Sequence, residues 1–235
     1  MTSSPSRTAA SGPERVWQRR VSGYLPQAAR LTSVLDAAEH ARLAAFRTAA
    51  DRHRYLVAHV AVRQLLGEHL GVAPSAVRIT RQPCTGCGGP HGRPVVAGTT
   101  GVHFSLSHAG DLVAVAVAAV PVGVDVEEVP PSHVAAATAP TALHPGELCE
   151  LAALPEAARP AAFARCWTRK EAYLKGTGTG LNRPPATVRA GAGPRPARIL
   201  GWRVADVPTL PGYAAAVAMY EEHEVTDELH GEEPG

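Results

Sequence analysis

Two acidic residues lie two positions apart in the segment Gly123-Val124-Asp125-Val126-Glu127. Side chains two positions apart on a strand point to the same side, so Asp125 and Glu127 place neighbouring carboxylates at the end of an apolar strand. Two such carboxylates repel each other unless a proton or a cation lies between them, and all-oxygen ligation suits Mg²⁺ or Mn²⁺. The same spacing is equally compatible with a solvated pair of acids where a strand leaves the core.

A second pair of ionisable residues, Glu171 and Lys175, lies in a segment predicted to be helical from about residue 160 to residue 175. Pro160 fits the first helical turn and Gly176 the helix end. Phe163 and Trp167 precede the pair at four-residue steps, so all four side chains lie on one face of the helix. Because the two aromatic residues are expected in the core, Glu171 and Lys175 are expected at a buried edge. The chain has two lysines among 23 basic residues, and this rarity favours a specific role over a surface ion pair.

Ser107 and His108 follow the predicted strand Val102–Leu106 and precede Ala109-Gly110, so we expect both side chains on an exposed turn. A hydroxyl and an imidazole at a turn can bind a phosphate. A Ser-His hydrolase is disfavoured, because no acid is fixed to the histidine and no G-x-S-x-G elbow occurs. The alternative is a solvated turn histidine.

Cys84-x-x-Cys87 followed by His91 is similar to half of a zinc knuckle. A closed structural site needs a fourth ligand, and the other two cysteines, Cys149 and Cys166, fall in predicted helices far along the chain. Zn²⁺ at Cys84, Cys87 and His91 and incidental or loop-stabilising thiols therefore both remain open. Without a secretion signal, four cysteines favour free thiols or a metal site over disulfides.

The elements that must position these residues are of the α+β class. Helices are predicted from Asp36, from Asp51 to a C-terminal Gly71, from about residue 145 to 154, and in the Glu171 segment. Strands are predicted at Val77–Ile79, Val102–Leu106, Leu112–Val120, Val122–Val126, Thr187–Arg189, Arg198–Val204 and Tyr213–Met219. The order indicates two halves, each with helices followed by a small, mostly antiparallel sheet, and no internal sequence repeat is strong enough to prove a duplication.

The predicted organisation has four parts with a linker at Pro130–Pro140. They are a disordered leader at 1–15, an N-terminal half at 16–129, a C-terminal half at 130–220 and an acidic tail at 221–235. The tail holds seven acids and no lysine or arginine, which leaves the body at a net charge of +9 and favours an anionic partner.

Composition limits the classes of function. The longest apolar run is nine residues, about half of what a bilayer requires, so we expect a soluble, cytoplasmic protein without membrane contact. Aromatic residues make up 5% of the chain, which disfavours the stacking platforms of single-strand nucleic-acid binders. A basic nucleic-acid-binding module stays open as an alternative.

In a set of ordered motifs the chain resembles the Sfp-type 4′-phosphopantetheinyl transferase family. Any one motif is a weak signal, whereas the ordered set, which spans residues 42–181 with the helical stretch 51–63, is specific. The matching segments are Gly92-Arg93-Pro94, Phe104-Ser105-Leu106-Ser107-His108, Gly123-Val124-Asp125-Val126-Glu127, and Trp167-Thr168-Arg169-Lys170-Glu171-Ala172-Tyr173-Leu174-Lys175 with residues 178–181.

The resemblance implies two similar α/β halves related by a pseudo-twofold, each a small, mostly antiparallel sheet packed against a long helix. It also implies that coenzyme A and Mg²⁺ bind in the cleft between these halves. It implies metal ligands at Asp125, Glu127 and Glu171, a pyrophosphate-binding pair at Ser107 and His108, cationic phosphate contacts at Arg42, Arg54 and Arg93, and an active-site lysine at Lys175. Glu147 lines up with an acid in the loop between the halves. Some relatives have lysine where this chain has Arg42 and Arg93, a change that preserves the charge.

The activity implied by the resemblance is transfer of the 4′-phosphopantetheine arm of coenzyme A to a serine of an apo acyl or peptidyl carrier protein, with release of 3′,5′-ADP. Glu171 would deprotonate the serine and Lys175 would stabilise the developing charge. A Mg²⁺-dependent phosphohydrolase that uses the same acids is the enzymatic alternative. The sequence leaves open whether fatty acid, polyketide or nonribosomal peptide (antibiotic) carriers are served. We expect a monomer, since two halves of one chain build one cleft.

Overall fold

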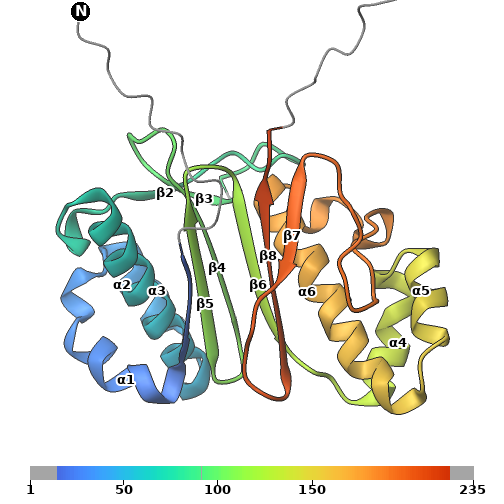
Figure 1. Ribbon diagram of the computed structural model, residues 1–235. Helices are drawn as coiled ribbons and strands as arrows, with labels where there is room; N and C mark the ends of the chain where they lie inside the picture. The colour runs from blue at the N-terminus through green and yellow to red at the C-terminus, as the bar shows by residue number, and fades with distance from the viewer. Residues whose placement is uncertain (1–14, 91, 223–235) are drawn as a thin grey trace, which may run out of the picture.

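Two three-stranded antiparallel sheets form the centre of the molecule, and helices cover them on either side (Figure 1). A computed structural model describes residues 15–90 and 92–222 of the chain. The first sheet has the order β1-β5-β4 and the second the order β6-β8-β7. Their bounds are β1 Arg15–Arg20, β4 His103–Ala109, β5 Leu112–Ala118, β6 Val122–Glu128, β7 Trp202–Asp206 and β8 Tyr213–Tyr220, and a separate ribbon pairs β2 Ile79–Arg81 with β3 Pro94–Val96.

One long helix packs on each sheet. α3 lies against β4 and β5, and α6 lies against all three strands of the second sheet. The α-helices are α1 Val21–Arg30, α2 Ala37–Ala45, α3 Ala49–Leu70, α4 Ser132–Ala142, α5 Pro145–Ala152 and α6 Arg159–Thr177, and the 3₁₀ turns are η1 Thr32–Val34, η2 Pro74–Ala76, η3 Glu156–Ala158, η4 Gly180–Asn182 and η5 Pro185–Thr187. None of the helices in the described ranges combines the length and the apolar content that a membrane crossing needs.

The two halves repeat one connection pattern. Each starts with a strand, continues through helices to a long helix, and ends in a hairpin whose second strand occupies the middle of the sheet. β1, α3, β4 and β5 thus correspond to β6, α6, β7 and β8. The prediction of two similar α/β halves with small antiparallel sheets is confirmed. The predicted boundary at residues 129–130 assigns β6 to the first half, whereas β6 pairs with β8 of the second.

β5 is buried on both faces, as the alternating pattern predicts. Val113 and Val115 face α3, whereas Ala114 and Ala116 contact the valines of β6 and β8. Each sheet has one face covered by a helix. The small alanine side chains let the other faces of the two sheets pack closely on each other.

The predicted helix starts at Asp36 and near Asp51 are confirmed. Asp36 caps α2, and α3 begins at Ala49. Gly71 ends α3, as predicted, in the left-handed conformation at φ 68°.

Four local predictions are wrong. Residues 132–142 form the helix α4 instead of a linker, because its alanines pack against α5 and α6 and outweigh the prolines that flank and interrupt it. Ser107 and His108 lie inside β4 instead of on a turn, because the hairpin turn comes later, at Gly110 with φ 50°.

The other two corrections concern the second half of the chain. α6 continues through Gly176, the predicted end, to a left-handed Gly178. No strand forms at Thr187–Arg189 within the described residues. Most of the predicted leader and acidic tail lies outside the described residues.

Gly123 lets β6 approach α6 more closely than any other residue type would allow. A Cβ placed at Gly123 would lie 1.9 Å from the carbonyl oxygen of Ala172 and 2.5 Å from the backbone nitrogen of Gly176. Both obstacles are backbone atoms, so neither can rotate away. Asp125 and Glu127 lie on the same face of β6 as Gly123, and this close packing sets their distance from α6.

We expect Gly123→Ala to lower the free energy of unfolding by about 1–3 kcal/mol, because the added methyl group forces β6 and α6 apart. Urea unfolding followed by circular dichroism measures this change. Gly193→Ala is the matched control, since a Cβ at Gly193 meets no atom within 4 Å. Equal unfolding midpoints for the two variants would contradict the prediction.

Candidate active site

The two sheets meet along β4 and β6, and serine side chains connect them there. The backbone N–H of Val124 donates to Ser105 Oγ at 3.0 Å, and Ser107 Oγ donates to Asp125 Oδ1 at 2.7 Å. Between β4 and β6 the described residues form no backbone ladder. We call this junction the seam. It brings the Ser107 motif and the Asp125 motif, from different halves of the chain, into direct contact.

Lys175 joins the seam from α6. Its Nζ lies 2.6 Å from Asp125 Oδ1 and donates to Ser107 Oγ at 2.9 Å. The Asp125 side chain is 2% exposed and the lysine side chain 30% exposed, so the ammonium connects a buried carboxylate to the solvent-facing cavity. The Lys175 side chain is therefore placed to meet an anionic ligand at the seam.

Glu127 on β6 and Glu171 on α6 lie near enough for the charge of one to affect the other. Burial and the negative charge of Asp125 raise the pKa of Glu127 to about 7, although a hydrogen bond from Trp167 opposes the rise. Burial and the same neighbouring charge also raise the pKa of Glu171. The two glutamates therefore hold their protons more tightly than usual, because burial first and the nearby Asp125 charge second disfavour their ionised forms.

The carboxylate oxygens at this position fit a divalent cation. Asp125 Oδ2 and Glu171 Oε1 are buried without a hydrogen-bond partner among the described residues. Buried polar oxygens rarely lack a partner, and an all-oxygen set of this kind suits Mg²⁺ or Mn²⁺. No three His, Cys, Asp or Glu side chains within 15–90 and 92–222 already have the mutual spacing of a formed metal site. Ligation by Asp125, Glu127 and Glu171 therefore requires these side chains to converge.

We expect Mg²⁺ to raise the melting temperature more at about pH 8 than at about pH 6. The folded-state pKa of both glutamates lies above the unfolded value, so without a cation stability falls as pH rises towards about 7 and the protons leave. A bound cation relieves the resulting repulsion and needs the deprotonated form. Differential scanning fluorimetry with and without Mg²⁺ measures the shift, and Glu127→Gln should flatten its pH dependence. An equal shift at both pH values would contradict the prediction.

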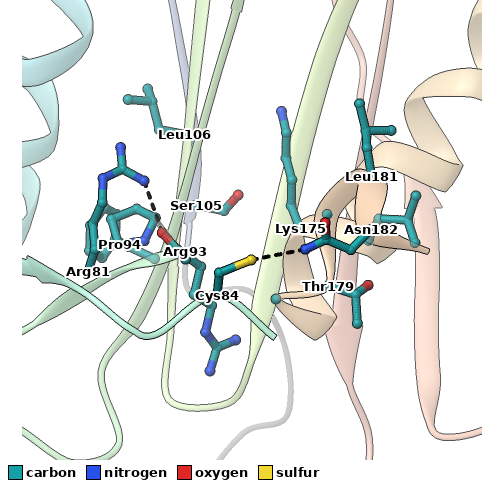
Figure 2. Close-up of a pocket in the computed structure, with 15 residues that line it drawn as sticks. Arg81, Cys84, Arg93, Pro94, Ser105, Leu106, Lys175, Thr179, Leu181 and Asn182 are labelled. Atoms are coloured by element: carbon teal, nitrogen blue, oxygen red, sulfur yellow. Dashed lines mark hydrogen bonds between the residues drawn. The ribbon is translucent and has the colours of Figure 1, made fainter. Parts of the chain in front are cut away.

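A cavity of about 460 Å³ opens beside the seam, within the range of ligand sites (Figure 2). Figure 2 shows Arg93 and Cys84 on one wall and Lys175, Thr179 and Asn182 on the other. The first wall is the loop between β2 and β3, and the second is the end of α6 with η4. A ligand in the cavity thus touches both halves of the chain.

A second cavity, of about 810 Å³, adjoins the first and contains Arg42. The two cavities share the lining residues Arg81, Pro94, Phe104 and Leu106. Arginines line both cavities, Arg93 the first, Arg42 the second and Arg81 both. Arg42 is placed over the Phe46 ring at 5.0 Å.

The other predicted cationic contacts, Arg93 and Arg54, bond backbone carbonyls of α6 and of the β4–β5 turn. Arg93 donates to Gln82 Oε1 and to the carbonyl of Gly176, both at 2.9 Å, and so spans from the β2–β3 loop to α6. Arg54 is paired with Asp51 and reaches the Gly110 carbonyl at 3.3 Å. Desolvation lowers the pKa of His108, and the positive charges of Arg54 and Lys175 lower it further.

The structure does not support zinc at the cysteine loop. Cys84 Sγ accepts a hydrogen bond from Asn182 Nδ2 at 3.1 Å, and the described residues supply no further ligand set around it. His91, the third predicted ligand, lies outside the described residues. Cys149 and Cys166 are free thiols elsewhere in the fold.

Glu147 lies outside the site. Its carboxylate is fully buried and forms a 2.6 Å ion pair with Lys170, the second of the two lysines. Burial opposes ionisation, but the hydrogen bond and charge of Lys170 outweigh it and lower the pKa of Glu147. The glutamate also accepts from the backbone N–H of Ala190 and Gly191, so the pair anchors the chain after η5 to α6.

Sequence reasoning missed several residues of the site. Ser105 was only part of a motif, yet it makes the seam contact of Val124. Arg81 lines both cavities, and Trp167 hydrogen-bonds Glu127 instead of only filling the core. The signals were weak: a serine two positions before Ser107, an arginine at the end of a short strand, and an aromatic residue one helical turn before Glu171.

Comparisons with known proteins agree with this geometry. The family model described as "4′-phosphopantetheinyl transferase, N-terminal" matches residues 22–120, and the model "4′-phosphopantetheinyl transferase superfamily" matches residues 121–218. The two matches meet directly before β6. They divide the chain as the sheets do.

Curated relatives have matching names. The chain is 30% identical to 4′-phosphopantetheinyl transferase HetI of Nostoc sp. over 75% of this chain and 73% of that protein. It is 32% identical to psf-1 of Bacillus pumilus over 58% of this chain and 55% of the relative, and 28% identical to Sfp of Bacillus subtilis over 57% and 56%. The matches thus span from about half to three quarters of the length of these relatives.

The chain thus consists of two similar α/β units, and its carboxylate–lysine site lies at the seam where they meet. With both halves matched and with HetI aligned over most of its length, the chain belongs to the 4′-phosphopantetheinyl transferase superfamily.

Proposed function

We propose that the chain transfers the 4′-phosphopantetheine arm of coenzyme A to a serine of an acyl or peptidyl carrier protein and releases 3′,5′-ADP. The contact of Lys175, Ser107 and Asp125 across the seam carries this proposal, because it joins an ammonium and a carboxylate of the second half to a hydroxyl of the first, beside a cavity that Arg81, Arg93 and Lys175 line. Phosphoryl transfer is catalysed mainly by such positioning and charge neutralisation.

Each residue has a distinct role in this proposal. Arg42, Arg54, Arg93 and His108 contact the nucleotide phosphates, Arg93 from the first cavity and Arg42 from the second. Ser107 with Lys175 contacts the pyrophosphate at the seam. Asp125, Glu127 and Glu171 hold Mg²⁺ or Mn²⁺, which supplies charge neutralisation for the pyrophosphate oxygens when bound. Lys175 stabilises charge on the phosphate that is leaving.

Glu171 acts as the general base. Its raised pKa suits this role, since a base that titrates closer to neutral pH takes a proton more readily. The serine proton passes to Glu171, and the serine oxygen forms a bond to the phosphorus that carries pantetheine. The bond from that phosphorus to the oxygen of 3′,5′-ADP breaks. Atoms and charge balance without an oxidant or a second nucleotide.

Further parts of the proposal concern the surroundings of the enzyme. We propose that it works in the cytoplasm as a monomer, because one chain supplies both walls of the site. The +9 body favours acidic carrier proteins, with polyketide and nonribosomal peptide carriers of antibiotic biosynthesis as candidates, over nucleic acid or a membrane surface.

Intact mass spectrometry tests the activity. An apo carrier protein incubated with coenzyme A, Mg²⁺ and the enzyme should gain the mass of one phosphopantetheine group, and a carrier whose acceptor serine is alanine should not. Release of phosphate from coenzyme A without a carrier would instead favour the phosphohydrolase. A salt-dependent gel shift with generic DNA, without carrier modification, would favour the nucleic-acid-binding module.

A further inference from the structure

The Cys84 thiol lies in an environment that stabilises its thiolate. Its sulfur accepts hydrogen bonds from the backbone N–H groups of Gly86 and Cys87, from Asn182 Nδ2 at 3.1 Å, and from the Cys87 side chain. These donors, the backbone ones first, lower the pKa of Cys84 to about 7. A cysteine with several donors and little opposing charge is a better nucleophile at neutral pH than a free one.

The second thiol needed for disulfide chemistry is adjacent. Cys87 is exposed, and its side chain reaches the Cys84 sulfur directly. Two backbone hydrogen bonds close the loop around the pair, from Gly88 N to the Cys84 carbonyl at 2.8 Å and from Cys84 N to the Gly89 carbonyl at 2.7 Å. The loop therefore holds the two sulfurs together without the help of a metal.

The cysteine pair is linked to both walls of the cavity by hydrogen bonds and close packing. Cys84 lines the 460 Å³ cavity, and its bond to Asn182 links the β2–β3 loop to η4 at the end of α6 (Figure 2). Gly86 packs so closely on Asn182 that a Cβ there would lie 2.8 Å from the amide carbon. The same loop continues to Arg93, whose guanidinium bonds Gly176 of α6. A change at the Cys84 sulfur is thus transmitted to both walls.

We propose that Cys84 and Cys87 form a thiol–disulfide modification site whose oxidation weakens coenzyme A binding, a consequence that rests on the proposed function. The Cys84 thiolate attacks one sulfur of a low-molecular-weight disulfide, and the first small thiolate leaves. Cys87 loses its proton to solvent and attacks the Cys84 sulfur of the mixed disulfide, and the second small thiolate leaves. Two protein thiols are oxidised and one small disulfide is reduced to two thiols.

The expected effect on the cavity follows from the bonds that change. In the disulfide the Cys84 sulfur carries no negative charge and turns towards Cys87, so Asn182 loses its acceptor. The link between the loop and η4 then opens, and the cavity walls that carry Arg93 and Lys175 separate. We expect coenzyme A affinity to fall about fivefold or more, an ordinary size for coupling between two sites.

Oxidised glutathione is the probe, and Cys149→Ser is the background, because Cys149 is an exposed thiol on α5. In that background the protein should lose the mass of two hydrogens. Adding Cys87→Ser should trap one glutathionyl group on Cys84, and adding Cys84→Ser should slow modification of Cys87 about tenfold or more. Asn182→Ala should slow the reaction at Cys84, because it removes a donor to the thiolate. Isothermal titration of coenzyme A into the reduced and oxidised proteins measures the affinities.

Several results would overturn the proposal. They are equal modification of Cys87 with and without Cys84, a tightly held zinc ion that blocks both thiols, and unchanged coenzyme A affinity after the disulfide has formed. The mass measurement is independent of transferase activity. Failure of the reduced protein to bind coenzyme A would count against the proposed function, whereas the exchange chemistry at Cys84 would still be measured.

Discussion

Glu171→Gln should lower the turnover of phosphopantetheine transfer by about 10²–10⁴-fold, the usual contribution of a general base, while the protein stays folded. Glutamine keeps the shape of the side chain but has no basic oxygen for the serine proton. Glu171 Oε1 has no hydrogen-bond partner in the described part of the chain, so the substitution breaks no structural bond made by that atom. Removing a carboxylate also relieves the repulsion from Asp125, and the melting temperature should not fall.

The measurement is single-turnover transfer to an apo carrier protein at saturating coenzyme A and Mg²⁺. Glu68→Gln is the matched control, because Glu68 is exposed in the last turn of α3 and lines neither cavity. It should keep the turnover of the unchanged enzyme. Turnover within about threefold of normal in folded Glu171→Gln would remove the general-base role, since the smallest expected effect is about a hundredfold.

Lys170→Met should destabilise the protein by about 3–5 kcal/mol, because it leaves the Glu147 carboxylate buried without its counter-ion. Both side chains have no exposed surface. The substitution also removes the hydrogen bonds that Lys170 Nζ donates to the carbonyl oxygens of Pro185, at 2.9 Å, and of Val188. The chain that follows η5 would lose its anchor to α6.

Urea unfolding measures the loss, and the double variant Lys170→Met with Glu147→Gln is the control. The neutral amide removes the uncompensated charge, so the double variant should be more stable than Lys170→Met alone. This non-additive result identifies the buried pair as the cause. A change below about 1 kcal/mol in the single variant would show that the site relaxes or admits water.

The two lysines illustrate what sequence could and could not predict. Their rarity indicates a specific role for both, and each ammonium does contact buried carboxylates. The motif alone does not separate the roles. Positions five apart on a helix point in different directions, and only the packed fold shows what each side chain meets. Lys175 reaches the seam, whereas Lys170 reaches α5 and the segment after η5.

Local periodicity predicted the faces that carry the site. Asp125 with Glu127 on a strand, and Glu171 with Lys175 on a helix, each follow from spacing within one element. The seam does not, because contacts such as Ser107 with Asp125 and Val124 with Ser105 join separate elements. β1 was not predicted either, since its residues Arg15–Arg20 are mostly polar and become a strand only by pairing with β5.

The seam also has a consequence for how the molecule moves. A backbone ladder of a sheet resists sliding, because each step of the register breaks several hydrogen bonds at once, whereas two serine hydroxyls can rotate and exchange partners singly. Along the seam itself, the hydrogen bonds between the halves can therefore exchange one at a time. The amide of Val124, whose hydrogen bond ends on a side chain, is a spectroscopic reporter of the seam in hydrogen exchange. Because Ser107 and Asp125 lie on the same seam, a local opening there also breaks the hydrogen bond between them.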